Sequence, residues 1–321
     1  MAKPEPSNWQ QLITGDWHGM PALFKPEGTQ VAFNRVSRSS VFENGRTTYY
    51  MHTNFSGSDV FTSRFQIPEF AFGVIDSDQD RVYTGPDFIG SGRPFGPLVD
   101  SEYFSPGWNV QLRTVNHIVP ERGLQVYSSQ LFEGNCLVAV FNGLYINTRD
   151  KEPETLQRID DFLAAEKANA TKPFVLPIKH KGQWRGTMQV YSAEQEYLGE
   201  NEVTIAYTPV DLVRAEMHVK ISGVVNREFK FLRSRNANHH QFHGPDAYGN
   251  GMSFGRYLYA RNHFFGEAAT LDSRETLIDD QFSLCAYWQF KKSQKEQFNT
   301  FGVLEWEAGE EVLKPQYVET K

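Results

Sequence analysis

Four sequence blocks occur twice in the same order, and this repeat constrains the fold more than any other feature of the chain. Residues 15–19 (GDWHG) return as residues 182–186 (GQWRG), and the Met-His pair at 51–52 returns at 217–218. Residues 85–96 match residues 244–255 at seven of twelve positions, and the apolar alternation of 124–132 returns in 282–290. A tandem duplication with small insertions explains all four blocks. We therefore expect two domains of one fold, for which 321 residues suffice.

Most of the chain alternates between polar and apolar residues, as β-strands do. In residues 214–221, charged or polar side chains occupy every second position and apolar side chains the others. Glycine and proline recur about every ten residues, which is typical of an antiparallel meander. Closure of such a sheet into a barrel buries its apolar face and removes exposed edges. The sequence therefore predicts an all-β fold of two tandem antiparallel barrels, each with about eight strands.

One segment between the two copies has helical rather than strand periodicity. Residues 153–167 carry four apolar side chains at helical spacing, and a proline stands in the first turn. The next residues, 169–177, contain two prolines and no periodicity, which indicates a linker. The expected domains are an N-terminal barrel over residues 1–150, a linker with one helix over 151–177, and a C-terminal barrel over 178–321.

Charge and composition exclude several classes of protein. Lys and Arg number 32 against 39 Asp and Glu, so the net charge of −7 provides no basic field for nucleic acid. The sequence has no signal-peptide core and no apolar run long enough to span a membrane, so we expect a cytoplasmic protein. Cys136 and Cys285 lack the spacing of a metal site, and we expect them to be small core residues. No Rossmann, Walker or nucleophile-elbow motif is present, and we expect neither a metal nor a cofactor.

The G-x-W motif that begins each copy resembles the opening of calycin barrels such as the lipocalins. The resemblance implies that Gly15 and Gly182 permit a turn and that Trp17 and Trp184 plug the closed end of each barrel. Lipocalins also place an arginine near the end of the last strand, and Arg149 is the candidate in copy one. The whole chain resembles tandem calycin-like proteins, most closely an uncharacterised family known from cyanobacteria. More distantly, it is similar to lipocalin-like hydratases and pericyclases.

This resemblance implies a function in small-molecule chemistry. We expect one barrel to bind a hydrophobic molecule, such as a terpenoid, a polyene or a polyketide-like compound. We further expect a cofactor-independent isomerisation, cyclisation or hydration of that molecule, promoted by the shape of the cavity and by one or two proton donors. Two alternatives stay open: a non-catalytic carrier or sensor of an apolar ligand, and a structural or assembly protein whose barrels are filled.

Aromatic residues make up 14% of the chain, and some of them are candidates to line a pocket. The alternative is that each ring fills core space. Arg93 and Met252 occupy equivalent positions in the third repeated block and are candidates for the mouths of the barrels, whereas Asp87 and Asp246 are expected to brace turns. The candidate ligand-binding rings are Tyr50, Phe65, Phe72, Tyr257, Tyr259, Tyr287 and Trp288.

Histidines provide the candidates for general acid–base chemistry. His239 and His243 fall in the densest histidine cluster; we expect this cluster to be a solvated loop, with acid–base catalysis as the alternative. His52 lies beside Tyr50 on a strand face of mild polarity, so these two residues are the other catalytic candidates.

Overall fold

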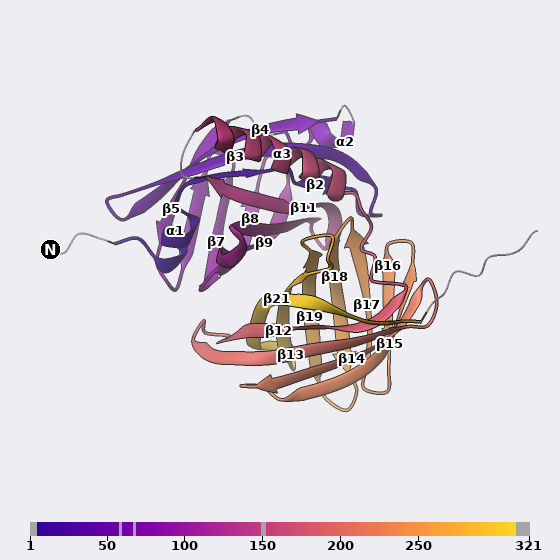
Figure 1. Cartoon of the computed structure of the whole chain (residues 1–321). Helices are drawn as coiled ribbons and strands as arrows, with labels where there is room; N and C mark the ends of the chain where they lie inside the picture. The colour runs from indigo at the N-terminus through magenta and orange to yellow at the C-terminus, as the bar shows by residue number, and fades with distance from the viewer. Residues whose placement is uncertain (1–4, 58–59, 67–68, 149–151, 313–321) are drawn as a thin grey trace, which may run out of the picture. The chain divides into compact units, whose positions relative to one another are not determined.

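The computed structural model of the chain describes residues 5–57, 60–66, 69–148 and 152–312. The chain divides into two compact units between Lys172 and Pro173. Each unit is an antiparallel β-barrel, and a helix lies between the two barrels in the sequence (Figure 1). The predicted fold class, two tandem antiparallel barrels joined by one helix, is confirmed.

The N-terminal barrel has ten strand positions. Its first position is shared by β1 (Asp16–Gly19) and β2 (Ala22–Phe24), because each of these short strands pairs with both β3 and β11 and thereby closes the ring. The remaining strands are β3 (Gln30–Glu43), β4 (Arg46–Ser56), β5 (Phe70–Asp76), β6 (Arg81–Gly85), β7 (Phe88–Phe95), β8 (Leu98–Ser105), β9 (Val110–Val119), β10 (Leu124–Glu133) and β11 (Cys136–Thr148).

The C-terminal barrel also has ten strands and is closed by pairing of its first strand with its last. The expectation of about eight strands per barrel is wrong, because the repeated blocks mark equivalent strands without fixing how many strands lie between them. Ten strands enclose a wider interior than eight. The strands are β12 (His180–Ser192), β13 (Tyr197–Pro209), β14 (Arg214–Gly223), β15 (Arg227–Asn236), β16 (His239–His243), β17 (Ala247–Phe254), β18 (Tyr257–Phe264), β19 (Ala269–Leu277), β20 (Leu284–Lys292) and β21 (Lys295–Glu311).

The repeated sequence blocks fall on equivalent places in the two barrels. The G-x-W motif begins the first strand of each barrel, β1 and β12, and the Met-His pair lies on the third strand position, β4 and β14. The glycine-rich block covers the turn after the fifth position and the sixth strand in both copies, and the last block reaches the ninth. This agreement in strand order supports a tandem duplication.

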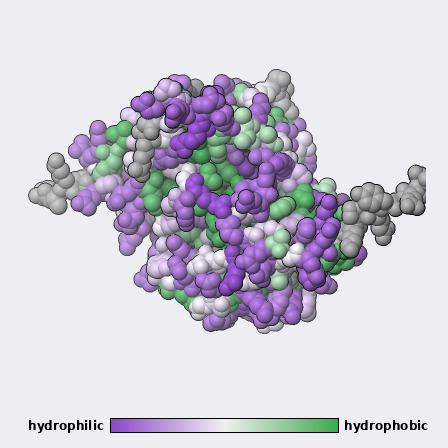
Figure 2. Space-filling view, viewed as in Figure 1, coloured by the Kyte–Doolittle hydropathy of each residue, from purple (hydrophilic) through white to green (hydrophobic). Residues whose placement is uncertain are grey.

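Helix α3 (Pro153–Asn169) packs on the outside of the N-terminal barrel, where Ile159 and Leu163 bury their side chains against Ile146 of β11. The Glu166 carboxylate accepts a hydrogen bond from the Leu144 backbone N–H at 2.9 Å. The opposite face of α3 is hydrophilic (Figure 2). None of the described helices is long and apolar enough to cross a membrane.

One end of the N-terminal barrel is closed by the short helix α1 (Asn8–Ile13), with Ser7 as its N-cap. Trp9 and Ile13 pack against Trp17, whose indole N–H donates to the Ile13 carbonyl at 2.9 Å. Trp184 is buried equally well in the second barrel and donates to the Phe282 carbonyl at 2.7 Å. Arg149 lies outside the described residues. The other helical turns are α2 (Val60–Ser63) and the 3-10 turn η1 (Pro120–Arg122).

Candidate functional site

The N-terminal barrel encloses a cavity of about 400 Å³. This volume lies within the range of sites that bind small molecules. Both Phe65 and Phe72, which the sequence suggested as ligand-binding rings, line the cavity. The phenylalanine and tryptophan rings of the wall are Phe55, Phe65, Phe70, Phe72, Phe88, Trp108 and Phe141.

The alternation of strand β4 decides which of its side chains face this cavity. Met51, Thr53 and Phe55 border the hollow, so the residues between them face outward. Tyr50 is accordingly 44% exposed, and His52 forms an exposed ion pair with Glu69 at 2.9 Å. The structure therefore places these two candidate catalytic residues on the outer surface rather than in the cavity.

The glycine-rich block of β7 makes room for tyrosines inside the barrel. A Cβ atom on Gly90 would lie 2.7 Å from a ring carbon of Tyr103, and one on Gly92 would lie 2.6 Å from the Tyr83 hydroxyl. Asp87, at the turn before β7, accepts hydrogen bonds from the Ser105 hydroxyl at 2.9 Å and from the backbone N–H of Gly107 at 3.0 Å. The block thus has a packing role.

Arg38 of β3 is the cationic group that borders the cavity. Its Nη2 donates to Oε1 of Gln125 at 2.6 Å, and Gln125 in turn donates from Nε2 to Oδ1 of Asn116 at 2.5 Å. The rings of Tyr49 and Tyr145 lie on either side, each with its centroid 5.9 Å from the Arg38 guanidinium carbon. Burial lowers the pKa of Arg38.

Three tyrosines, Tyr103, Tyr127 and Tyr145, also border the cavity. Burial raises the pKa of Tyr127 to about 12 and raises the pKa values of Tyr103 and Tyr145 well above their usual range. All three hydroxyls are therefore protonated at neutral pH. They are suited to donate hydrogen bonds to a ligand and are poor general bases.

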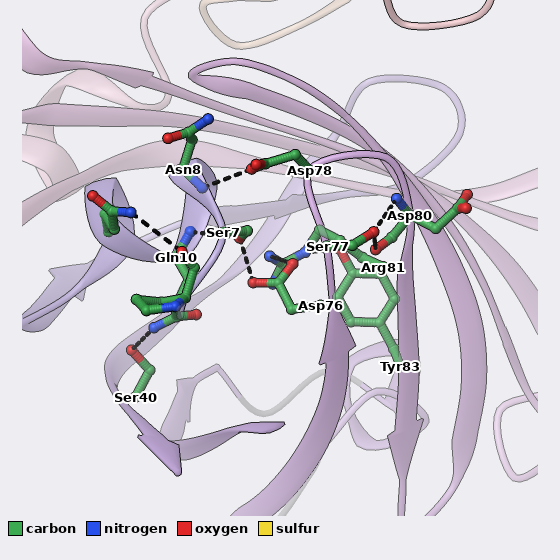
Figure 3. A network of polar contacts seen from close by, with 12 residues as sticks. Ser7, Asn8, Gln10, Ser40, Asp76, Ser77, Asp78, Asp80, Arg81 and Tyr83 are labelled. Carbon is green, nitrogen blue, oxygen red and sulfur yellow. Dashed lines mark hydrogen bonds and ion pairs between the residues drawn. The ribbon is translucent and has the colours of Figure 1, made fainter. Parts of the chain in front are cut away.

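A second arginine lies deeper, between the cavity and the closed end of the barrel. Arg81 Nη1 pairs with Oδ1 of Asp76 at 2.6 Å, and both side chains are buried (Figure 3). Arg81 also donates to the hydroxyls of Tyr83 and Tyr49, each at 3.0 Å, and Ser7 of the N-cap donates to Asp76. These contacts tie α1 to β5 and β6, so the network closes the barrel.

The interior of the C-terminal barrel is filled. Its internal void is about 40 Å³, about one tenth of the volume of the cavity in the first barrel. Trp288 borders this void and donates from its indole nitrogen to Oε1 of Glu275 at 3.1 Å. The Tyr287 hydroxyl donates to Asn299, and Tyr257 is buried. Trp288 thus belongs to the core of this barrel, whereas Tyr257 and Tyr287 alternate along their strands with the core residues Leu258 and Trp288 and lie outside that core.

The remaining candidates lie away from both interiors. Arg93 alternates with the inward side chains of β7 and approaches Asp100 at 3.6 Å across the strand pair. Met252 and Tyr259 are half-buried neighbours on β17 and β18 and do not border the void. Asp246 accepts a hydrogen bond from the backbone N–H of Lys230 at 3.1 Å and so braces a neighbouring strand.

The histidine cluster forms strand β16, so the expectation of a solvated loop is wrong. Pairing with both β15 and β17 supplies the ladder that holds the segment extended. His239 and His243 face solvent, whereas His240 is buried between Arg233 and the Ser253 hydroxyl. Within the described ranges, no group of three or more His, Cys, Asp or Glu side chains is arranged to hold a metal ion.

Sequence reasoning missed several polar groups of the cavity, among them Arg38, Asn116, Tyr103, Tyr127 and Tyr145. Each of them lies on a strand whose alternation was readable. The missing information was which of the two faces points inward. On β4, the polar character of Tyr50 and His52 suggested a catalytic face, but these two residues point outward and Met51 and Phe55 point into the cavity.

Comparison with known proteins places the fold without assigning an activity. No family model matches the chain, and no curated protein matches it. The structure is similar to that of a protein of unknown function from the DUF3598 family of Nostoc punctiforme, with a TM-score of 0.58 and 13% identity over 94% of this chain and 99% of that one. This likeness shows the fold alone.

Two further solved structures match over most of their length but superpose poorly. Kievitone hydratase from Nectria haematococca has a TM-score of 0.21 and 8% identity over 95% of this chain and 96% of its own. A porin of Rh. blastica has a TM-score of 0.19 and 8% identity over 91% of this chain and 98% of its own. The fold and the cavity together define a tandem-barrel protein, consistent with a tandem calycin, in which one barrel is hollow and the other filled.

Proposed function

We propose that the protein binds a hydrophobic small molecule inside its N-terminal barrel. The observation that carries this proposal is the cavity of about 400 Å³, lined by many aromatic rings, in the N-terminal barrel. The void inside the C-terminal barrel is only about 40 Å³. A terpenoid, polyene or polyketide-like compound has the apolar surface that such a wall would cover.

The wall supports an apolar ligand because its rings are already held in place before any ligand arrives. Phe65 is fully buried and lies edge-to-face against Trp108, with ring centroids 5.4 Å apart. The Phe72 ring stacks on Tyr49, with ring centroids 4.9 Å apart, and lies edge-to-face against Phe88, with centroids 5.4 Å apart. Rings that are fixed by one another lose little further entropy when a ligand binds, which favours affinity.

Titration of the full-length protein with the neutral apolar fluorophore N-phenylnaphthylamine tests this proposal. Leu112 of β9 borders the cavity, whereas its neighbour Gln111 bonds to Glu102 on an exposed surface. Leu112→Trp adds bulk inside the barrel, and Gln111→Trp adds the same bulk outside. We expect saturable binding to the wild type, a loss of about tenfold or more in Leu112→Trp from steric exclusion, and little change in Gln111→Trp. No saturable binding to the wild type, or equal effects of both variants, would refute the proposal.

A second function, cofactor-independent conversion of the bound molecule, is favoured by the protonated hydroxyls of Tyr103, Tyr127 and Tyr145 in the cavity. Hydrogen bonds from these hydroxyls would stabilise negative charge that develops during an isomerisation, a cyclisation or the addition of water. Incubation with apolar host extracts, followed by mass spectrometry, tests this step. The wild type should change a compound that Tyr127→Phe binds equally well but leaves unchanged; a carrier would leave every compound unchanged.

A cytoplasmic location is part of the same proposal. Its support is that, among the described residues, neither the exposed Cys136 nor the buried Cys285 forms a disulfide, as is usual in a reducing compartment.

A further inference from the structure

We infer that Arg38 is an anion-binding subsite of the cavity, and that the molecule bound there is an apolar compound bearing a carboxylate. This inference rests on the proposed binding function and names the chemical class of the ligand. It is carried by the position of Arg38 on the cavity wall and by the absence of an ion-pair partner for it among the described residues.

The contrast with the second arginine of the same barrel makes this absence informative. Arg81 is buried and is neutralised by Asp76, with 2.6 Å between Nη1 and Oδ1. Arg38 has tyrosine rings beside it and an uncharged amide, Gln125, as its hydrogen-bond acceptor. A guanidinium in a low-dielectric interior is costly unless it is paired, so an uncompensated one indicates a partner that comes from outside the chain.

The charged groups that border the cavity within the described part of the chain do not supply that partner. Asp87 also borders the hollow, but it is engaged by the Ser105 hydroxyl and the Gly107 N–H. Burial has the largest effect on the pKa of Arg38 and lowers it, and the positive charge of Arg81 lowers it further, whereas Tyr49, Tyr145 and Tyr103 act in the opposite direction. The pKa of Arg38 is lowered, first by burial, whereas the pKa of Arg81 is raised because Tyr49, Tyr83 and Asp76 outweigh the effect of burial.

The neighbours of Arg38 also hold its side chain in a fixed orientation. One Nη nitrogen is anchored on Gln125, which is itself fixed by Asn116, and the Tyr49 and Tyr145 rings lie at 5.9 Å. The planar fork of a guanidinium matches the two oxygens of a carboxylate. Tyr127 and Tyr145 border the same hollow and carry protonated hydroxyls that would assist. Aromatic and aliphatic side chains make up much of the rest of the wall, so the anionic group should lie at the end of an apolar body.

Competition against N-phenylnaphthylamine tests the inference on the full-length protein. The competing probes are laurate and dodecanol, which share an apolar chain and differ in the charged head. Arg38→Met removes the charge and keeps much of the apolar length, and Arg38→Lys keeps the charge but not the fork. Arg35→Met is the matched control, because Arg35 lies on the same strand and pairs outside the barrel with Asp160 of α3.

We expect the wild type to bind laurate about tenfold or more tightly than dodecanol, since hydrogen bonds to charged groups are strong. Arg38→Met should lose this preference while still binding N-phenylnaphthylamine, Arg38→Lys should keep part of it, and Arg35→Met should keep all of it. Equal affinities of the wild type for the two probes would overturn the inference, even if Arg38→Met failed to fold. Failure of the wild type to bind the neutral fluorophore would instead refute the binding function itself.

Discussion

Replacing Arg81 by methionine should destabilise the N-terminal barrel strongly, whereas replacing Arg38 by methionine should change its stability little. Arg81→Met removes the partner of Asp76, whose side chain is fully buried. Arg38→Met removes a charge that lacks a carboxylate partner among the described residues. If Arg38 serves ligand binding rather than folding, the first substitution should be damaging and the second should not.

The magnitudes follow from the contacts of each side chain. Removal of one member of a buried ion pair costs about 3–5 kcal/mol, because an uncompensated charge stays behind. Arg38→Met gives up a charge-assisted hydrogen bond to Gln125, worth about 1.5–3 kcal/mol. It also removes the desolvation penalty of the guanidinium, which is several kcal/mol. The second term offsets or exceeds the first, so Arg38→Met should cost no more than about 1 kcal/mol.

Differential scanning calorimetry of the full-length variants without ligand measures both effects. For a domain of this size, a change of 1 kcal/mol in the free energy of unfolding shifts the melting temperature by about 2–4 °C. The transition of the N-terminal barrel should therefore fall by about 6–20 °C in Arg81→Met and by no more than a few degrees in Arg38→Met. A fall in Arg38→Met as large as that in Arg81→Met would show that Arg38 is a structural residue and would refute this reasoning.

Two further predictions concern the rest of the fold. Burial, together with the charge of Arg233, lowers the pKa of His240 to about 2, whereas an unfolded histidine titrates near 6.5. Because the unfolded chain takes up this proton first, stability is complete above about pH 6.5, and acidification from about pH 7 to pH 5 should cost about 2 kcal/mol. His240→Gln should reduce that loss in urea unfolding; an identical pH dependence in both proteins would contradict the prediction. Glu166→Ala leaves the Leu144 N–H without its carboxylate and should cost about 1–3 kcal/mol, whereas the exposed substitution Asp161→Ala should change the urea midpoint little.

The architecture was predictable because duplication and alternation are local in sequence. The G-x-W frame and the Met-His pair fixed equivalent strands in the two copies, and the periodicity of 153–167 marked α3. The number of strands was not predictable, because the repeated blocks leave the intervening hairpins uncounted.

To predict the cavity from the sequence, one would have to know which face of each strand points into the barrel. A shift of one residue exchanges the two faces of a strand, so Tyr50 and His52 were as plausible as Met51 and Thr53 before the barrel was closed. Phe65 and Phe72 were identified by their aromatic character alone. No sequence pattern distinguishes Arg38 from the polar residues near it. Its role becomes visible only in the structure, where Asp76 pairs with Arg81 and not with Arg38. The sequence also did not show which barrel is filled, because both copies are rich in aromatic residues that can either fill a core or line a cavity.

A crystal structure of the full-length protein grown with a fatty acid brominated at its tail would locate the ligand directly. We predict one anomalous bromine peak per chain, inside the N-terminal barrel, with the carboxylate of the fatty acid on the guanidinium of Arg38. Bromine in the C-terminal barrel, or an empty N-terminal barrel at saturating fatty acid, would contradict the assignment of the hollow barrel as the binding site.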